Sequence, residues 1–337
     1  MSELNTSTIS DFVLNAEIIF NRELDSVPQT ARRSGLFKEI PFAQNNGDSM
    51  KFSEIDLEEY ADKKSEGDQS ARASVQQGYT KEGNLYRVSK DITVTYEMRS
   101  RGKYLDVTNR LTSLGKMVPN RMDLDLTHRI TFGTATTYTD KNGESVDISV
   151  GDTLALFDTA HTLRGSSTTF RNRVAGNPQV SPGAIEAIEK MRVENTFNQF
   201  GEKMTMSADI IWSSEDPNTI RTIQEILRST SNTTQNNPGV VNTFAGQYRH
   251  VVLPRLATDS NGAVDSTKAK YWGIASSMMS TAYLGVHEEA RLKTPPAEGK
   301  SNEEFSTDDW TFGTRGGYMI VIVSASWISF SSGDGAA

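Results

Sequence analysis

The chain has 337 residues, of which 36% are hydrophobic and 23% charged, with a formal net charge of −8, which suits one large folded domain or two moderate ones. Its longest apolar run, residues 318–323, is far shorter than a transmembrane helix, and its first residues show neither the basic nor the apolar region of a secretory signal. The absence of cysteine excludes disulfides and thiolate metal sites, and an acidic chain without a lysine and arginine cluster is unlike a DNA-binding module.

The N-terminal third predicts a short helix and a hairpin. Residues 9–20 place apolar side chains at helical spacing, which predicts an amphipathic helix lying either on its own domain or on a neighbouring subunit. Residues 51–55 alternate polar and apolar side chains, and residues 91–98 are rich in β-branched ones, as strands are. About thirty polar residues separate these strands, so we expect them to bound an extended hairpin arm, with a disordered insertion as the alternative.

The next elements are a long helix and a small hairpin. Apolar positions recur at helical spacing over residues 101–132, with Pro119 as a point where the helix bends or is interrupted. A Lys-Asn-Gly turn at 141–143 precedes alternating apolar residues at 146–150, which predicts a short hairpin.

Two helices and several strands are predicted in the rest of the chain. Ser181 and Asp216 each stand before a proline, the pattern of a capping side chain followed by proline in the first helical turn. Residues 204–212 and 248–253 indicate strands, and residues 310–330 predict two strands joined by a turn at 315–317. The overall class is α+β.

Few residues suggest chemistry. The four histidines show no metal-binding spacing on a helix, and Asp158 with His161 is the one candidate acid–base or ligand pair, a pattern that is more often a structural hydrogen bond. The glycine run at 313–317 precedes a strand, whereas a dinucleotide site requires a helix. Carboxylate pairs at 58–59 and 303–304 lie in polar stretches that do not tune a pKa. We therefore expect no catalytic, cofactor or metal residue and no enzymatic activity, and the four tryptophans are interpreted as packing anchors: Trp212, Trp272, Trp310 and Trp327.

Several stretches, in this order, resemble the major capsid proteins of tailed bacteriophages with the Hong Kong 97-type fold, and in particular Mu-like major head subunits. The Phe-Asp-Thr-Ala-His segment at 157–161, followed by the serine-capped helix from Ser181, is similar to the middle of those proteins. Residues 209–217 resemble the strand-to-helix segment of the axial domain, and residues 309–317 resemble the tryptophan and arginine strand pair near the end.

The resemblance implies a domain plan that covers nearly the whole chain. A spine helix would lie in the peripheral domain, and the axial domain would gather around five-fold and six-fold axes. The implied units are an N-terminal arm (1–36), an extended hairpin loop (37–98), a peripheral domain with the spine helix (99–178), an axial domain (179–298) and the return strands of the peripheral domain (299–337).

The resemblance also implies a function, which is self-assembly into the icosahedral head that encloses double-stranded phage DNA. The chain would form pentamers and hexamers and would interact with scaffold and portal proteins, while binding of cement proteins is left undecided. It would contact DNA only non-specifically, and no cofactor or membrane is expected. It would reside in the virion after assembly in the host cytoplasm. Because the arm begins near Met1, the scaffold is expected to be separate or absent. The alternatives are an encapsulin-like compartment shell and a hydrolase or metal-dependent enzyme using Asp158 and His161. Contacts between subunits are expected at the N-terminal helix and at the hairpin, neither of which has an evident partner in the chain.

Overall fold

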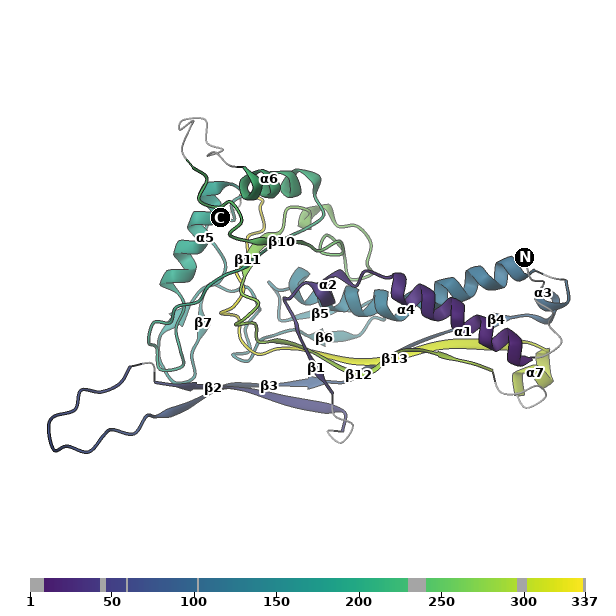
Figure 1. The fold of residues 1–337 in the computed structure, drawn as a ribbon, viewed down its shortest axis with the longest axis horizontal. Helices are drawn as coiled ribbons and strands as arrows, with labels where there is room; N and C mark the ends of the chain where they lie inside the picture. The colour runs from purple at the N-terminus through teal and green to yellow at the C-terminus, as the bar shows by residue number, and fades with distance from the viewer. Residues whose placement is uncertain are drawn as a thin grey trace.

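The computed structural model describes residues 9–42, 47–58, 60–101, 103–229, 241–295 and 302–335. Within these ranges the molecule is elongated. A long helix, α4 (Tyr104–Thr131), lies along a four-stranded sheet in one half, and a three-stranded sheet with helices lies in the other half (Figure 1). A separate two-stranded hairpin extends beyond the body. This mixture of helices and mainly antiparallel sheets confirms the α+β class.

The four-stranded sheet has the order β1-β12-β13-β4. Strand β13 (Trp310–Ile322) pairs in antiparallel fashion with β12 (Ala282–Lys293) and with β4 (Tyr86–Val94), while β1 (Lys38–Pro41) is parallel to β12. The predicted turn at 315–317 is wrong, because β13 runs through these residues and they pair with β4 along their whole length.

The glycines of β13 allow a helix to approach the sheet. A Cβ atom on Gly316 would lie 2.7 Å from Cγ1 of Val118, a buried residue of α4. A larger side chain would therefore hold α4 away from the sheet. The long helix predicted from the periodicity is confirmed, and Pro119 lies inside it without ending it.

The N-terminal helix α1 (Ile9–Ser26) lies on α4 of its own chain, as Figure 1 shows. Ala16 and Phe20 are buried in a cluster with Leu111, Leu114 and Trp310. The contact is close, since a Cβ on Gly115 of α4 would lie 2.9 Å from the backbone oxygen of Phe20. The helix was predicted to lie either on its own domain or on a neighbouring subunit, and in the structure it lies on its own domain. The expectation that its apolar side has no partner in the chain is therefore wrong for the side chains that the structure describes.

The segment after α1 is also part of the body. Helix α2 (Thr30–Arg33) contacts α4, where the backbone N–H of Ala31 donates to Oδ1 of Asp123 at 2.7 Å. Leu36 and Phe37 then belong to the largest buried cluster, directly before β1.

The three-stranded sheet has the order β10-β9-β11. Strand β9 (Ile210–Ser213) pairs in parallel with β10 (Arg249–Val252) and antiparallel with β11 (Trp272–Ala275). Both predicted helix starts are confirmed. Ser181 accepts a hydrogen bond from the backbone N–H of Ala184 at the start of α5 (Pro182–Glu194), and Asp216 accepts one from Thr219 at the start of α6 (Pro217–Arg228).

Two predicted strands are shorter than expected. The strand expected at 91–98 ends with β4 at Val94, and helix α3 (Tyr96–Ser100) follows, because Thr95 and Asp309 accept the N–H groups of Met98 and Tyr96. In the segment 204–212 only the last three residues belong to a strand, the start of β9.

The remaining elements are short. The small hairpin predicted near residue 141 is confirmed as β5 (Thr137–Thr139) and β6 (Ser145–Asp147), although Ile148 and Val150 follow β6. The others are β7 (His161–Thr162), β8 (Thr169–Phe170), the 3-10 turn η2 (Ser266–Lys268) and α7 (Asn302–Thr307). All four tryptophans are buried, as their interpretation as packing anchors requires.

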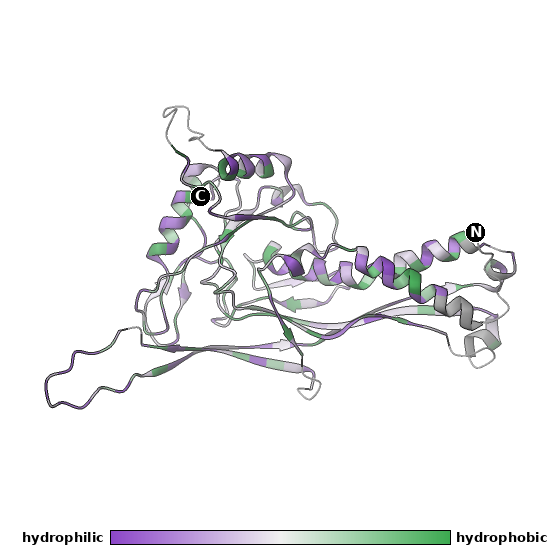
Figure 2. Ribbon diagram, viewed as in Figure 1, coloured by the Kyte–Doolittle hydropathy of each residue, from purple (hydrophilic) through white to green (hydrophobic). Residues whose placement is uncertain are grey.

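The arm is a hairpin of β2 (Ser49–Leu57) and β3 (Val75–Asn84). The prediction that residues 91–98 form its second strand is wrong, because that segment belongs to β4 of the main sheet. Between β2 and β3, the loop extends away from the body, and Figure 2 shows it as mainly hydrophilic. The predicted hairpin is therefore present, but its second strand is β3, which lies closer to β2 in the sequence than the predicted segment 91–98 does.

Candidate functional site

The distal part of the arm, residues 55–75, has little cover from its own chain. Every described side chain at 60–75 is exposed. Apolar residues also gather on its outer face, where Ile55, Leu57 and Val75 are 67%, 59% and 63% exposed. Leu57 lies directly opposite Val75 in the ladder, so their side chains share one face of the hairpin. A cluster of exposed apolar residues on a projecting hairpin is a surface suited to contact with another protein.

The base of the arm is attached to the body by packing and polar contacts. Phe52 stacks on Tyr283 of β12 with ring centroids 4.7 Å apart. Nζ of Lys81 lies 2.8 Å from Oδ2 of Asp147, and the hydroxyls of Tyr79 and Thr162 are 2.9 Å apart. These contacts fix the direction in which the arm leaves the body.

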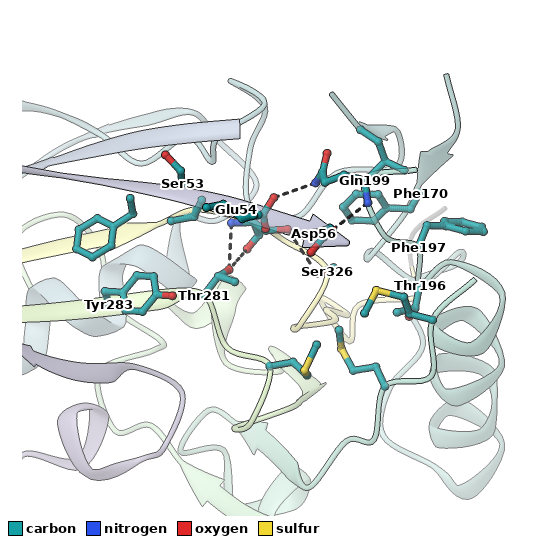
Figure 3. Close-up of a pocket in the computed structure, with 18 residues that line it drawn as sticks. Ser53, Glu54, Asp56, Phe170, Thr196, Phe197, Gln199, Thr281, Tyr283 and Ser326 are labelled. Atoms are coloured by element: carbon teal, nitrogen blue, oxygen red, sulfur yellow. Dashed lines mark hydrogen bonds between the residues drawn. The ribbon is translucent and has the colours of Figure 1, made fainter. Parts of the chain in front are cut away.

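A pocket of about 290 Å³ lies between the arm base and the body. Figure 3 shows Glu54 and Asp56 of β2 pointing into it, toward Gln199. Phe170, Phe197 and three methionines (Met204, Met206 and Met279) form much of its apolar wall. The pocket thus combines two carboxylates of the arm with an apolar surface of the body.

Gln199 connects the arm to the body. Its Nε2 donates to Oε2 of Glu54 at 3.0 Å, and its backbone N–H donates to Oδ2 of Asp56 at 2.9 Å. Its Oε1 accepts the backbone N–H of Arg164 at 3.1 Å. Gly78 of β3 makes this approach possible, since a Cβ there would lie 2.9 Å from both the Gln199 Cδ and the Glu54 Cβ.

Glu54 has an unusual protonation equilibrium. Burial, and after it the negative charges of Asp56 and Asp152, raise its pKa to about 7, against hydrogen bonds from Ser324 and Gln199 that lower it. At neutral pH this carboxyl is therefore close to half protonated, which is unusual for a glutamate.

The structure does not bring Asp158 and His161 together as an acid–base pair. His161 is fully buried, and its Nδ1 lies 2.8 Å from Oδ2 of Asp152. Burial raises the pKa of Asp152, but the hydrogen bond and charge of His161 together with the backbone N–H groups of Leu154 and Thr162 outweigh this effect and leave the pKa below its usual value. Asp158 instead accepts the N–H groups of Thr159 and Ala160 in its own turn. The cavity beside Asp152 measures about 10 Å³, room for no more than a water molecule.

The other polar candidates have structural contacts. His128 and His250 lie 3.0 and 2.9 Å from the hydroxyls of Thr258 and Ser213. Glu58 accepts the backbone N–H of Ser74, whereas Glu59 and the side chains of the pair at 303–304 lie outside the described residues. In the part of the chain that the structure describes, no group of three acidic or histidine side chains is arranged to hold a metal. None of the helices described there is long and apolar enough to span a membrane.

The residue pattern of β2 indicates the pocket. The alternation over 51–57 puts Phe52, Glu54 and Asp56 on one face of β2 and Ile55 and Leu57 on the other. Beyond Ser53 the inner face therefore carries the two carboxylates and the outer face carries Ile55 and Leu57, the reverse of an ordinary surface strand.

Comparison with known proteins finds similarity in structure only. No protein-family model and no curated protein sequence matches the chain. Among solved structures, one from Mycobacterium phage Adephagia has a TM-score of 0.50 at 12% identity, over 90% of this chain and 89% of that one. The capsid asymmetric unit of cyanophage Pam1 has a TM-score of 0.50 at 11% identity, over 88% and 89%. The mature capsid of bacteriophage PhiM1 has a TM-score of 0.50 at 11% identity, over 88% and 85%. The chain therefore shares the fold of phage capsid subunits, as its resemblance to the Hong Kong 97-type fold implies.

Proposed function

We propose that this protein is a structural subunit that self-assembles into the icosahedral head of a tailed phage, around double-stranded DNA, without catalytic activity. The observation that carries the proposal is the distal arm, whose apolar face of Ile55, Leu57 and Val75 is exposed in the single chain. The shared fold with phage capsid subunits supports the same function.

The arm suits a contact with a second copy because it is anchored at one end only. Phe52 and Lys81 attach its base to the body, while residues 61–75 extend into solvent. A contact between such an arm and a different surface of the next copy is heterologous, and repeated contacts of this kind close into rings and shells when the rotation closes. Many modest contacts then add up to a stable particle.

The finer parts of the proposal concern organisation and partners. Pentamers and hexamers would be formed by the unit at 179–298, with the units at 99–178 and 299–337 as the peripheral domain and residues 37–98 as the extended loop. Scaffold and portal proteins would act during assembly in the host cytoplasm. The formal charge of −8 favours only non-specific contact with packaged DNA, since like charges repel.

Substitution of Leu57 by glutamate tests the arm. Because the side chain is exposed in the single chain, Leu57→Glu should leave the subunit folded, whereas burying a carboxylate at a subunit contact costs several kcal/mol and should raise the concentration needed for assembly more than about tenfold. Light scattering and negative-stain electron microscopy would measure particle formation. Leu105→Glu is the matched control, since it is the same substitution at a residue of α4 that is 74% exposed and lies outside both the arm and the unit at 179–298.

Two results would contradict the proposal. If Leu57→Glu formed normal particles at the concentrations that suffice for the unmodified protein, the arm would have no role in assembly. An unmodified protein that stays monomeric at every concentration and salt condition would refute the shell function itself. Shells that contain protein cargo in place of DNA would favour a bacterial compartment over a phage head.

A further inference from the structure

The arm has a bend point at Glu54. The register of the β2–β3 ladder shifts between Ser53 and Ile55, so that Glu54 lies opposite two residues, Gly78 and Tyr79. An extra residue of this kind is a β-bulge, which bends a hairpin and interrupts its hydrogen-bond ladder. The hairpin can therefore change direction at Glu54 more easily than elsewhere.

The contacts on the two sides of this bulge differ in kind. Toward the base, Phe52 stacks on Tyr283 and Lys81 pairs with Asp147. At and beyond the bulge, the arm is held mainly by hydrogen bonds. Gln199 donates to Glu54 and Asp56, Nη1 of Arg164 donates to the carbonyl of Gly78 at 3.1 Å, and Tyr60 donates to the carbonyl of Lys203 at 3.4 Å.

The surroundings of Glu54 disfavour its ionised form. The charges that act on it are those of Asp56 on the same strand and Asp152 on the body, both negative. His161 is engaged by Asp152, and Arg164 directs its Nη1 to a backbone carbonyl. A neutral Glu54 can remain in the pocket with its hydrogen bonds, whereas an ionised one is stabilised by leaving the pocket for water.

We propose that Glu54 is a pH-sensitive latch, which in its neutral form holds the arm against Gln199 and Ser324 and on ionisation releases the arm to bend at Gly78 and Tyr79. This property belongs to the single subunit and does not depend on shell formation. In an assembling subunit it would set the angle at which the arm reaches its neighbour.

The pH range follows from linkage. The pKa of Glu54 is about 7 in the docked arm and returns toward 4.5 when the side chain reaches solvent. A carboxyl whose pKa is raised in the docked state favours docking at low pH and loses this contribution as pH rises through the docked value. The docking equilibrium should therefore fall by about 30-fold between pH 5.5 and pH 8.5, with most of the change below pH 7.5.

Hydrogen exchange of the full-length subunit tests the latch, followed at the backbone amide of Gln199, which donates to Asp56 across the contact. After correction for the intrinsic rate, its protection should fall about 30-fold from pH 5.5 to pH 8.5. In Glu54→Gln, which cannot ionise, protection should stay high throughout. Glu82→Gln is the matched control, because it makes the same change on an exposed residue of the same hairpin and should keep the pH dependence of the unmodified protein.

A second variant makes the test independent of the first. Asp56→Asn removes one negative charge near Glu54 while keeping an acceptor for the Gln199 amide, so the transition should move to lower pH. An unmodified protein without a transition in this range would overturn the proposal. So would a transition that persists in Glu54→Gln, or one that does not move in Asp56→Asn.

Discussion

Replacing Phe20 by alanine tests whether α1 belongs to its own subunit. Phe20 is 1% exposed and lies in the cluster formed with Leu111, Leu114 and Trp310. Truncating a buried phenylalanine removes its transfer free energy and leaves a cavity, which together cost about 3–5 kcal/mol. Against a typical total of about 5–15 kcal/mol, this loss should be large in the isolated subunit.

Urea unfolding at a subunit concentration below that of assembly, followed by tryptophan fluorescence, would measure the effect. Ile18→Ala is the matched control, because Ile18 lies on the same helix and is 59% exposed, so the free energy of unfolding should change by no more than about 0.5 kcal/mol. A loss below about 1 kcal/mol for Phe20→Ala, or an equal loss in both variants, would mean that α1 does not dock on α4 in the single subunit.

Two further predictions concern the long helix and its contacts. Gly316→Ala should destabilise the subunit by about 1–3 kcal/mol, because its Cβ would lie 2.7 Å from Val118. Gly317→Ala is the control and should cost less, since the nearest atom to its Cβ would be 3.6 Å away. Equal melting temperatures for the two variants would contradict the packing of α4 on β13. Burial and then the charge of Lys268 lower the pKa of His128 to about 4, so the folded state loses stability as pH falls from 6.5 toward 4. Between pH 7 and pH 4.5 the unmodified protein should therefore lose about 2 kcal/mol more stability than His128→Gln, as measured in urea. An equal pH effect in the two proteins would refute the assignment.

The elements that could be predicted from the sequence are those with local signals. The helices α5 and α6 begin where Ser181 and Asp216 supply a capping oxygen, a contact made within three residues. The helix α4 was predicted almost to its ends, because its 28 residues repeat an apolar stripe many times.

The elements that were predicted wrongly depend on contacts between distant parts of the chain. Gly78 and Gly83 occupy buried positions of β3 where Gln199 and Met319 supply the volume, so the strand shows no apolar alternation. The glycines of β13 look like a turn in the sequence, yet they lie in a continuous strand, where Gly316 faces Val118 of α4 and Gly317 faces His287. Because β3 lacks this alternation, the next segment with a β-branched signal, β4, was assigned to the arm, although β4 pairs with β13.

The residues of the candidate site likewise depend on contacts between distant parts of the chain. Asp158 is the acidic residue nearest to His161 in the sequence, but Asp152, nine residues away, is the one that contacts it. The environment of Glu54 is made by Asp152, Gln199 and Ser324, which come from three separate parts of the chain, so its raised pKa has no local signature.

The continuity of β13 has a mechanical consequence. At about 3.3 Å per residue, its 13 residues extend for about 40 Å along the molecule, with β12 and β4 bonded on either side. Such a ribbon acts as a stiff lever along the half of the molecule that holds the four-stranded sheet. A rotation of about 5° at one end moves the other by about 3–4 Å, on the scale of one residue step. Slight differences in tilt between copies could thus be amplified along β13 into different curvatures, without any change in the core at either end.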